Sequence, residues 1–165
     1  MSKEYFLSDT HFWHRNIIGY ANREFDTIEA MNQFMVYKWN SVVTKHDTII
    51  FGGDFAFATK EKQKELLSKL NGKEIILVKG NHDSSNKYMK EVGFSQVVKV
   101  YETDKYVVRH DPLDFTAKEI ISRKFLLYGH LHQKFWDLPR AFNICVEPLA
   151  YTPHTLDQLI QLYKG

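Results

Sequence analysis

Histidine, aspartate and asparagine side chains recur in short polar clusters that directly follow apolar runs of this 165-residue chain. The clusters are Ser8-Asp9-Thr10-His11, Gly53-Asp54, Gly80-Asn81-His82-Asp83, His110 and Gly129-His130-Leu131-His132. Imidazole, carboxylate and amide groups gathered without thiolate suit divalent ions such as Mn, Fe, Zn or Ni. The clusters therefore predict a metal site with nitrogen and oxygen ligands.

These groups outnumber what a single ion needs. A centrally placed Asp can bridge two ions about 3.5–4 Å apart, and such a pair holds both the attacking and the leaving oxygen of a phosphoryl displacement. One such residue alone is more often a cap, a turn residue or a surface group, and that interpretation is better for His46 and His154. A purely structural interpretation fails for the whole set of clusters. So many like charges and buried polar groups would destabilise the fold unless metal ions were bound.

Three short apolar runs must position the first clusters. Residues 5–8, 48–51 and 74–79 are rich in Ile, Val, Leu and Phe without clear alternation, which is typical of parallel strands buried on both faces. Ligands of an open α/β sheet bind beyond the carboxyl ends of its strands. The pattern therefore predicts that the clusters converge.

Segments with helical periodicity separate these runs. One apolar face predicts a helix that starts at Asp26 with Glu29 three residues later, and it consists of Ile28, Met31, Met35, Trp39 and Val42. A second helix, with Leu66, Leu67 and Leu70, should end at Asn71-Gly72, and a shorter one should end near Gly93.

The second half is richer in predicted strands. Residues 96–101 and 105–110 predict a hairpin with its turn at 102–104, and residues 124–128 and 141–146 predict two more strands. A layered α/β sandwich accommodates both the helix-connected first half and this second half.

Length and composition favour one domain over residues 1–165, since 44% apolar content supplies one core of ordinary size. The 22 basic and 20 acidic residues nearly balance, which gives no reason to expect a nucleic-acid surface. Cys145 is the only cysteine, which fits a reducing compartment. Without a signal-peptide pattern or an apolar run of about 20 residues, we expect a cytoplasmic protein with no membrane contact. The sequence carries no signal for an oligomeric state.

Taken in order, the five clusters resemble the motifs of the calcineurin-like metallophosphoesterases: Asp-x-His, Gly-Asp, Gly-Asn-His-Asp, a lone His and Gly-His-x-His. The resemblance extends from Asp9 to His132. Residues 11–18, followed by Asn22-Arg23, are similar to a small, cap-less bacterial and phage branch of that family. The resemblance implies a layered αββα sandwich of two mixed β-sheets flanked by helices.

The resemblance also implies the ligands of two divalent ions, with Mn favoured and Fe, Zn or Ni as alternatives. Asp54 would bridge the ions, and a hydroxide between them would be the nucleophile. The first ion would be held by Asp9, His11 and His132, and the second by Asn81, His110 and His130.

The family pattern gives His82 a different role, because this residue is expected to face the substrate and to protonate the leaving oxygen. Asp83 would orient the His82 imidazole and keep it protonated. Since Arg and His readily contact phosphate oxygens, we also expect substrate contacts from His14 and Arg23, with Arg15 as a further candidate.

The sequence thus predicts a dinuclear metal-dependent phosphoester hydrolase. A phosphodiesterase acting on small cyclic or linear nucleotides is favoured, because a chain of this length has no room for a cap over the site. A phosphomonoesterase or nucleotidase of the same fold is one alternative, and a non-catalytic protein-binding scaffold is another. Nucleic acid is a less favoured partner, because neither a basic stripe nor interleaved aromatic residues are present.

Overall fold

The computed structural model describes residues 1–164, in which strands from the first part of the chain form one parallel sheet. Its order is β1-β2-β3-β4, and the strands are β1 (Glu4–Leu7), β2 (Thr48–Phe51), β3 (Glu74–Val78) and β4 (Gln96–Val98). Every neighbouring pair in this sheet is parallel. The three predicted apolar runs therefore correspond to adjacent strands, as expected.

The second sheet has the order β5-β6-β7-β8 and is mixed. Strands β6, β7 and β8 run parallel, and β5 pairs antiparallel with β6. The strands are β5 (Tyr101–Glu102), β6 (Tyr106–Arg109), β7 (Phe125–Tyr128) and β8 (Ala141–Asn143). The two-sheet sandwich with flanking helices is confirmed, but only the second sheet is mixed, since the first is parallel throughout.

The two sheets share one apolar core. Residues of both contribute to it, including Phe6 and Ile50 from the first sheet and Val108 and Leu127 from the second. A parallel bridge between Ser8 and Cys145 joins the sheets just beyond the end of β1. The carboxyl ends of β1 and of the second-sheet strands are thereby brought to the same edge of the sandwich.

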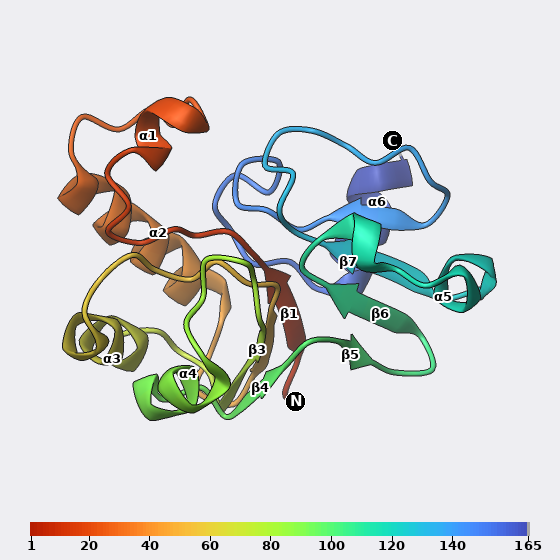
Figure 1. Ribbon diagram of the computed structural model, residues 1–165, viewed down its shortest axis with the longest axis horizontal. Coiled ribbons are helices and arrows are strands. Elements are labelled where there is room, and N and C mark those ends of the chain that lie inside the picture. Colours follow the sequence, from red (N-terminus) through yellow and green to blue (C-terminus); the bar gives the residue numbers. More distant parts are fainter. Residues whose placement is uncertain (165) are drawn as a thin grey trace.

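Helices cover the outer sides of the sandwich (Figure 1). Helices α2 (Ile28–Val42), α3 (Lys60–Ser68) and α4 (Asn86–Val92) lie on the side of the first sheet, and α5 (Ala117–Ile121) and α6 (Leu156–Lys164) lie with the second. Two short elements complete the described chain, α1 (Ile17–Tyr20) and the 3₁₀ turn η1 (Pro112–Asp114).

Helix α2 buries the predicted face, with Met31, Met35 and Trp39 inaccessible. Its start differs from the prediction, because Thr27 rather than Asp26 is the N-cap and accepts a hydrogen bond from the Ala30 N–H at 3.1 Å. Thr27 has the extended backbone conformation that places its side-chain oxygen over the first free N–H groups.

The predicted hairpin is wrong in its first arm. Residues 96–98 form β4 of the first sheet, and only Tyr101–Glu102 pairs with β6. The chain crosses between the sheets at Lys99, with Val98 packing on the larger core and Val100 on a smaller second core. Because both sides of the crossing are apolar, the sequence showed one continuous strand.

Among residues 1–164, no helix has both the length and the apolar character needed to cross a membrane.

Candidate metal centre

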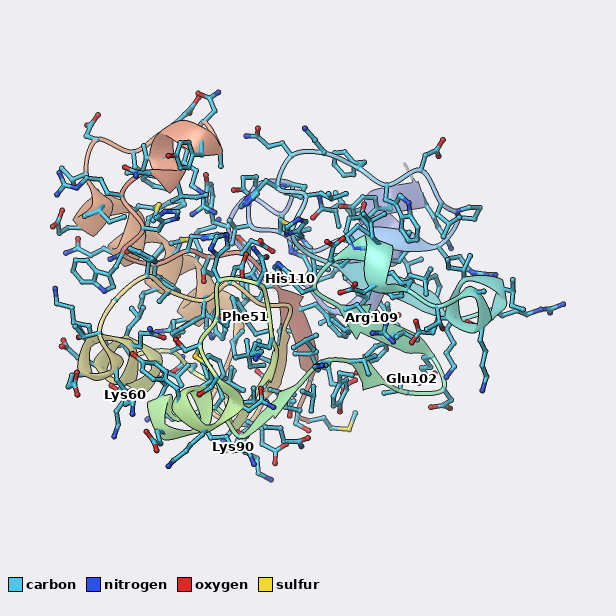
Figure 2. All side chains as sticks on the ribbon, viewed as in Figure 1. Phe51, Lys60, Lys90, Glu102, Arg109 and His110 are labelled. Atoms are coloured by element: carbon cyan, nitrogen blue, oxygen red, sulfur yellow. The ribbon has the colours of Figure 1, made fainter. Side chains whose placement is uncertain are left out.

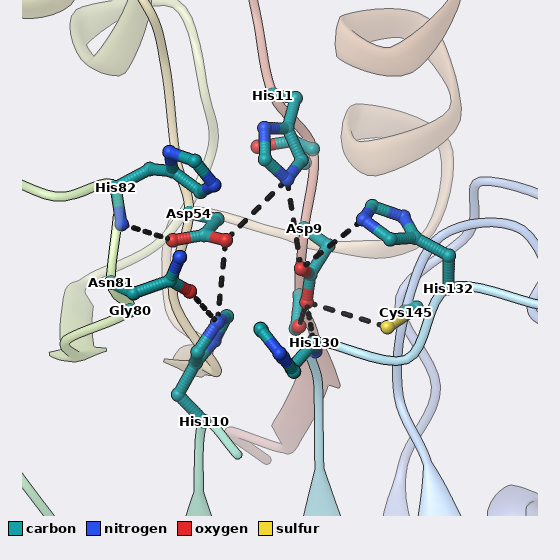
Figure 3. A network of polar contacts seen from close by, with 12 residues as sticks. Asp9, His11, Asp54, Gly80, Asn81, His82, His110, His130, His132 and Cys145 are labelled. Atoms are coloured by element: carbon teal, nitrogen blue, oxygen red, sulfur yellow. Dashed lines mark hydrogen bonds and ion pairs between the residues drawn. The ribbon is translucent and has the colours of Figure 1, made fainter. Parts of the chain in front are cut away.

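The polar clusters that follow β1, β2, β3, β6 and β7 converge on one site (Figure 3). His110 lies near the middle of the molecule, between the ribbons of the two sheets (Figure 2). Two groups of ligand atoms form, each within 4.8 Å, and each group combines residues from both sheets: Asp9, His11 and His132 in the first, and Asp54, His110 and His130 in the second.

The backbone at these positions is unusual. Five of the six residues have left-handed φ angles: Asp9 (57°), His11 (48°), Asp54 (57°), His130 (67°) and His132 (52°). Non-glycine residues rarely adopt this region, and they cluster at functional sites when they do. The sharp turns direct side chains that are close in sequence back toward the sheet edge. This explains how Asp9 and His11, two residues apart, both reach the site.

Two glycines allow the chain to approach the carboxylates closely. A Cβ on Gly80 would overlap the Asp54 carboxylate, and a Cβ on Gly129 would overlap the Asp9 carboxylate. Any larger residue at either position would have to displace an acidic group of the site.

Asp9 has one oxygen held by the protein and one left free. Its Oδ2 accepts hydrogen bonds from the Ser8 hydroxyl, the His130 N–H at 3.0 Å and the Cys145 thiol at 3.3 Å. Its Oδ1 is buried without a hydrogen-bond partner among residues 1–164. Burial favours protonation, but the nearby His11, His110 and His132 outweigh it and hold the pKa of Asp9 well below its usual value. Oδ1 is therefore available as an anionic ligand.

Asp54 belongs to the second group and also faces the first. Its Oδ1 accepts a hydrogen bond from the His82 N–H at 2.9 Å. Its Oδ2 is 3.5 Å from Nε2 of His11 in the first group and 3.3 Å from Nε2 of His110 in the second. A single carboxylate oxygen thus faces ligands of both groups, which is the arrangement a bridging residue requires.

His110 is held in one orientation. Its Nδ1 is 2.7 Å from the Gly52 carbonyl oxygen, so this nitrogen carries a proton, and its Nε2 is 3.0 Å from Oδ1 of Asn81. Burial opposes the charged form of His110, but the hydrogen bond to Asp54 and the charges of Asp9 and Asp54 raise its pKa to about 9. Nε2 of His110 therefore lies close to both Asn81 Oδ1 and Asp54 Oδ2.

His132 is oriented by Glu147, a residue that the sequence analysis missed. Oε1 of Glu147 accepts from Nδ1 of His132 at 2.9 Å, leaving Nε2 directed toward Oδ1 of Asp9 at 3.9 Å. The same Oε1 accepts from Nε and Nη2 of Arg23 at 3.0 and 2.9 Å. A carboxylate on the distal nitrogen of a metal-binding histidine fixes its tautomer and raises its basicity.

Arg23 is not placed to meet a substrate, in contrast to the prediction. Its side chain is fully buried, and besides pairing with Glu147 it donates to the carbonyl oxygens of Thr10 and Asp9, each at 2.7 Å. These bonds occupy the guanidinium and fix the turn that contains Asp9. The positive charge of Arg23 stabilises the Glu147 carboxylate, which in turn orients His132 of the first group.

The predicted role of Asp83 is also corrected. Its carboxylate accepts from the backbone N–H groups of Asp54 at 2.8 Å, Phe55 at 3.0 Å and Gly80 at 2.8 Å. No hydrogen bond joins it to the His82 imidazole among the described residues. Asp83 therefore ties the turn after β2 to the turn after β3, and its burial raises its pKa above the usual value.

The remaining predicted residues lie at the rim. His82 is exposed, with its ring centroid 5.6 Å from that of His11, and His14 is half-buried with its ring 5.4 Å from the same histidine. Asn81 is likewise exposed. Arg15 is exposed and makes no side-chain hydrogen bond or ion pair within residues 1–164, so no contact brings it to the site.

The two groups fit divalent ions. Oδ1 of Asp9 and Nε2 of His11 are buried polar atoms without hydrogen-bond partners in the described chain, and they lie 3.6 Å apart. Nitrogen and oxygen ligands bound at about 2.0–2.2 Å lie roughly 3–3.5 Å from one another around an ion, so small adjustments suffice. The donor set, which contains no thiolate ligand, suits a metal of the Mn, Fe or Zn kind.

Comparison with known proteins gives a family match. The calcineurin-like phosphoesterase superfamily domain matches residues 4–143, which include every member of both groups.

Three similar proteins extend the match. An uncharacterized protein of Methanocaldococcus jannaschii is 33% identical over an alignment 178 positions long, which covers 99% of this chain and 93% of that protein. The gene 66 protein of Mycobacterium phage L5 is 32% identical over 87 residues, covering 50% of this chain and 41% of its own. The crystal structure of a protein of unknown function from Aquifex aeolicus is 25% identical, with a TM-score of 0.75 and coverage of 98% and 100%.

Proposed function

Because the chain belongs to the calcineurin-like phosphoesterase superfamily, we propose that it is a dinuclear metal-dependent hydrolase of small, nucleotide-like phosphodiesters. The observation that carries the proposal is the position of Asp54, whose Oδ2 faces His11 of one ligand group and His110 of the other. A carboxylate oxygen shared between two ligand groups supports a pair of ions rather than a single one.

Seven residues would hold the ions, and Asp54 would contribute to both. Two divalent ions, with Mn favoured, would polarise the phosphoryl group and activate the attacking water. The chain's own contribution is to fix four of these ligands, Asp9, Asp54, His110 and His132, beforehand through hydrogen bonds to their other polar atoms. The ligands proposed for the first ion are Asp9, His11 and His132, and those for the second are Asn81, His110 and His130.

His82 is proposed as the general acid. Its backbone N–H is anchored on Oδ1 of Asp54, and its exposed ring stands beside His11 at the mouth of the site. An imidazolium in this position can donate a proton to a leaving oxygen without serving as a metal ligand. Because the Asp83 carboxylate is bonded to backbone N–H groups, it does not orient the His82 ring. The orientation of that ring depends instead on the turn that carries His82.

A pocket beside the second group, together with the rim histidines beside the first, supports a diester over a monoester. On one side, an open pocket of about 480 Å³ adjoins the second group and is lined by Asn81, His110, His130 and Lys79 among others. On the other side, His14 and His82 flank His11 at the rim. A phosphodiester has a substituent on each side of phosphorus, and both could be accommodated.

The test is to strip purified protein with a chelator, restore it with Mn²⁺, and measure hydrolysis of bis(4-nitrophenyl) phosphate and 4-nitrophenyl phosphate. We expect activity to vanish and return with the metal, with the diester hydrolysed faster. Activity that survives thorough chelation would overturn the metal-dependent mechanism. Metal binding without turnover of any phosphoester would instead identify a binding scaffold.

A further inference from the structure

We propose that Phe57 and Tyr20, together with the ring of His14, form a stacking subsite for a planar aromatic group of the substrate, a nucleobase in a nucleotide ester. This inference rests on the proposed function and specifies what occupies one side of its site. None of these residues belongs to the two ligand groups.

The two aromatic side chains, Phe57 and Tyr20, are both exposed to solvent. Phe57 is 68% exposed and Tyr20 is 78% exposed, although each ring could bury a large apolar surface. Single exposed aromatic residues are common on protein surfaces and need no explanation. Here, however, two residues far apart in sequence gather around a third ring.

That third ring connects them to the metal centre. The ring centroid of His14 lies 5.2 Å from that of Phe57 and 6.3 Å from that of Tyr20. The ring centroid of His14 also lies 5.4 Å from that of His11, a proposed metal ligand. The single ring of His14 therefore links Phe57 to a proposed metal ligand.

The backbone that carries Phe57 is fixed, so its ring is presented in a defined place. The Phe57 N–H donates to the Phe12 carbonyl oxygen at 2.8 Å, and Phe12 forms a parallel bridge with Ala56. Phe12 is completely buried and packs edge-on against Phe55. A ring held on a rigid support loses little entropy when a ligand stacks on it.

The chemistry of the surface favours a planar aromatic ligand. Phe57 offers no hydrogen-bonding group, so it can select a ligand by its π-face but cannot read base identity. Replacing a stacking aromatic residue by alanine typically weakens binding about 5- to 150-fold per base. That range sets the effect expected here.

The test compares two ligands that differ only in the base. Binding of adenosine 5′-monophosphate and of ribose 5-phosphate to the Mn-loaded full chain is measured by titration calorimetry. We expect the wild-type protein to bind the nucleotide at least 5-fold more tightly. In Phe57→Ala and in the double variant with Tyr20→Ala this preference should shrink or vanish, while ribose 5-phosphate affinity stays constant and Phe57→Trp retains the preference.

Tyr37→Ala is the matched control, because Tyr37 is 70% exposed on α2 and should leave both affinities unchanged. Equal affinity of the wild-type protein for both ligands would overturn the stacking subsite, as would a preference that survives in the double variant. In either case metal-dependent binding of ribose 5-phosphate would leave the proposed function standing. If neither ligand binds and no phosphoester is hydrolysed, the proposed function itself fails.

Discussion

At the scale of single residues, four of the proposed ligands, Asp9, Asp54, His110 and His132, have their second polar atom held by a neighbour. Oδ2 of Asp9 is held by Ser8, Cys145 and the His130 N–H, and Nδ1 of His132 is held by Glu147. The free atoms are consequently pre-oriented toward the metal positions. Burial raises the pKa of the Cys145 thiol well above its usual value, so this thiol acts as a donor to Asp9.

Replacing Glu147 by Gln should weaken metal binding in the first group. The variant removes the negative charge that orients His132 and pairs with buried Arg23. Loss of such a supporting partner typically costs about 10- to 100-fold in metal affinity. Competition of Mn²⁺ between the protein and a chromophoric chelator measures this effect.

The control for this substitution is Glu24→Gln, an exposed carboxylate with no described partner near the site. We expect one of two bound ions to be weakened in the Glu147 variant and neither in the control. Two ions bound with wild-type affinity in Glu147→Gln would show that the contact to His132 is only structural.

Replacing His82 by Ala should separate metal binding from proton transfer. No proposed ligand is removed, so the variant should retain both ions. Its rate should fall about 10²- to 10⁴-fold with a ribose ester, whose alkoxide needs a proton, and less with a nitrophenyl ester. Steady-state kinetics on both esters test this. Equal losses on the two esters would instead indicate electrostatic stabilisation of the phosphoryl oxygens, and loss of metal would make His82 a ligand.

At the scale of secondary-structure elements, the turns after the strands determine where the ligands point. The Asp83 carboxylate joins the turns after β2 and β3 through N–H groups of both. On the second sheet, Arg109 at the end of β6 forms a paired hydrogen bond with Glu119 of α5. Glu119 also accepts from the Thr116 N–H in a capping box, so it fastens α5 to the strand that precedes His110.

Replacing Glu119 by Gln should lower the free energy of unfolding by about 1–2 kcal/mol near neutral pH. Burial opposes ionisation of Glu119, but the hydrogen bonds from Arg109 and Thr116 lower its pKa below the ordinary 4.5. A group whose pKa is lowered on folding stabilises the protein above its unfolded pKa and loses this contribution as the pH falls through the folded value. The difference between wild type and variant should therefore shrink as the pH drops below 4.5.

Urea unfolding of both proteins from pH 7 to pH 3 measures the difference, with Glu61→Gln as an exposed control on α3. A difference that stays constant over this range would contradict an ionic role of Glu119.

The elements also show where sequence patterns were sufficient. The first three strands and α2 were predicted because buried parallel strands and a long apolar helix face have strong local patterns. The crossing at Lys99 was missed because apolar residues continue on both sides of it. The helix α6 was not predicted at all, although its Leu159 is completely buried.

For the site, the motifs placed all seven proposed ligands at one sheet edge, because strand ends are encoded locally. The supporting partners could not be predicted, since Glu147 lies 15 residues from His132 and 124 from Arg23. Arg23 and Asp83 were assigned functional contacts because sequence alone does not show that other partners already occupy their side chains.

At the scale of the whole molecule, the metal centre lies where the two sheets meet. Each ligand group takes residues from both sheets, with Asp9 and His11 joined by His132, and Asp54 joined by His110 and His130. Bound ions would therefore connect the two halves of the sandwich at their common edge.

Metal should consequently stabilise the entire fold. A ligand that binds only the folded state at 100 times its Kd adds about 2.7 kcal/mol per site. We expect Mn²⁺ to raise the Tm of chelator-treated protein, and Asp54→Asn to show a smaller rise because both ions lose a shared ligand. Differential scanning calorimetry with and without Mn²⁺ measures this. An equal Tm in both conditions would mean that the groups do not hold ions in the folded protein.

Anomalous diffraction from crystals soaked in Mn²⁺ tests the central claim most directly. The predicted result is two anomalous peaks per chain about 3.5–4 Å apart. One peak should lie among Asp9, His11 and His132, the other among Asn81, His110 and His130, and Asp54 should lie between them. A single peak, peaks away from these residues, or two peaks that do not share Asp54 would contradict the dinuclear centre.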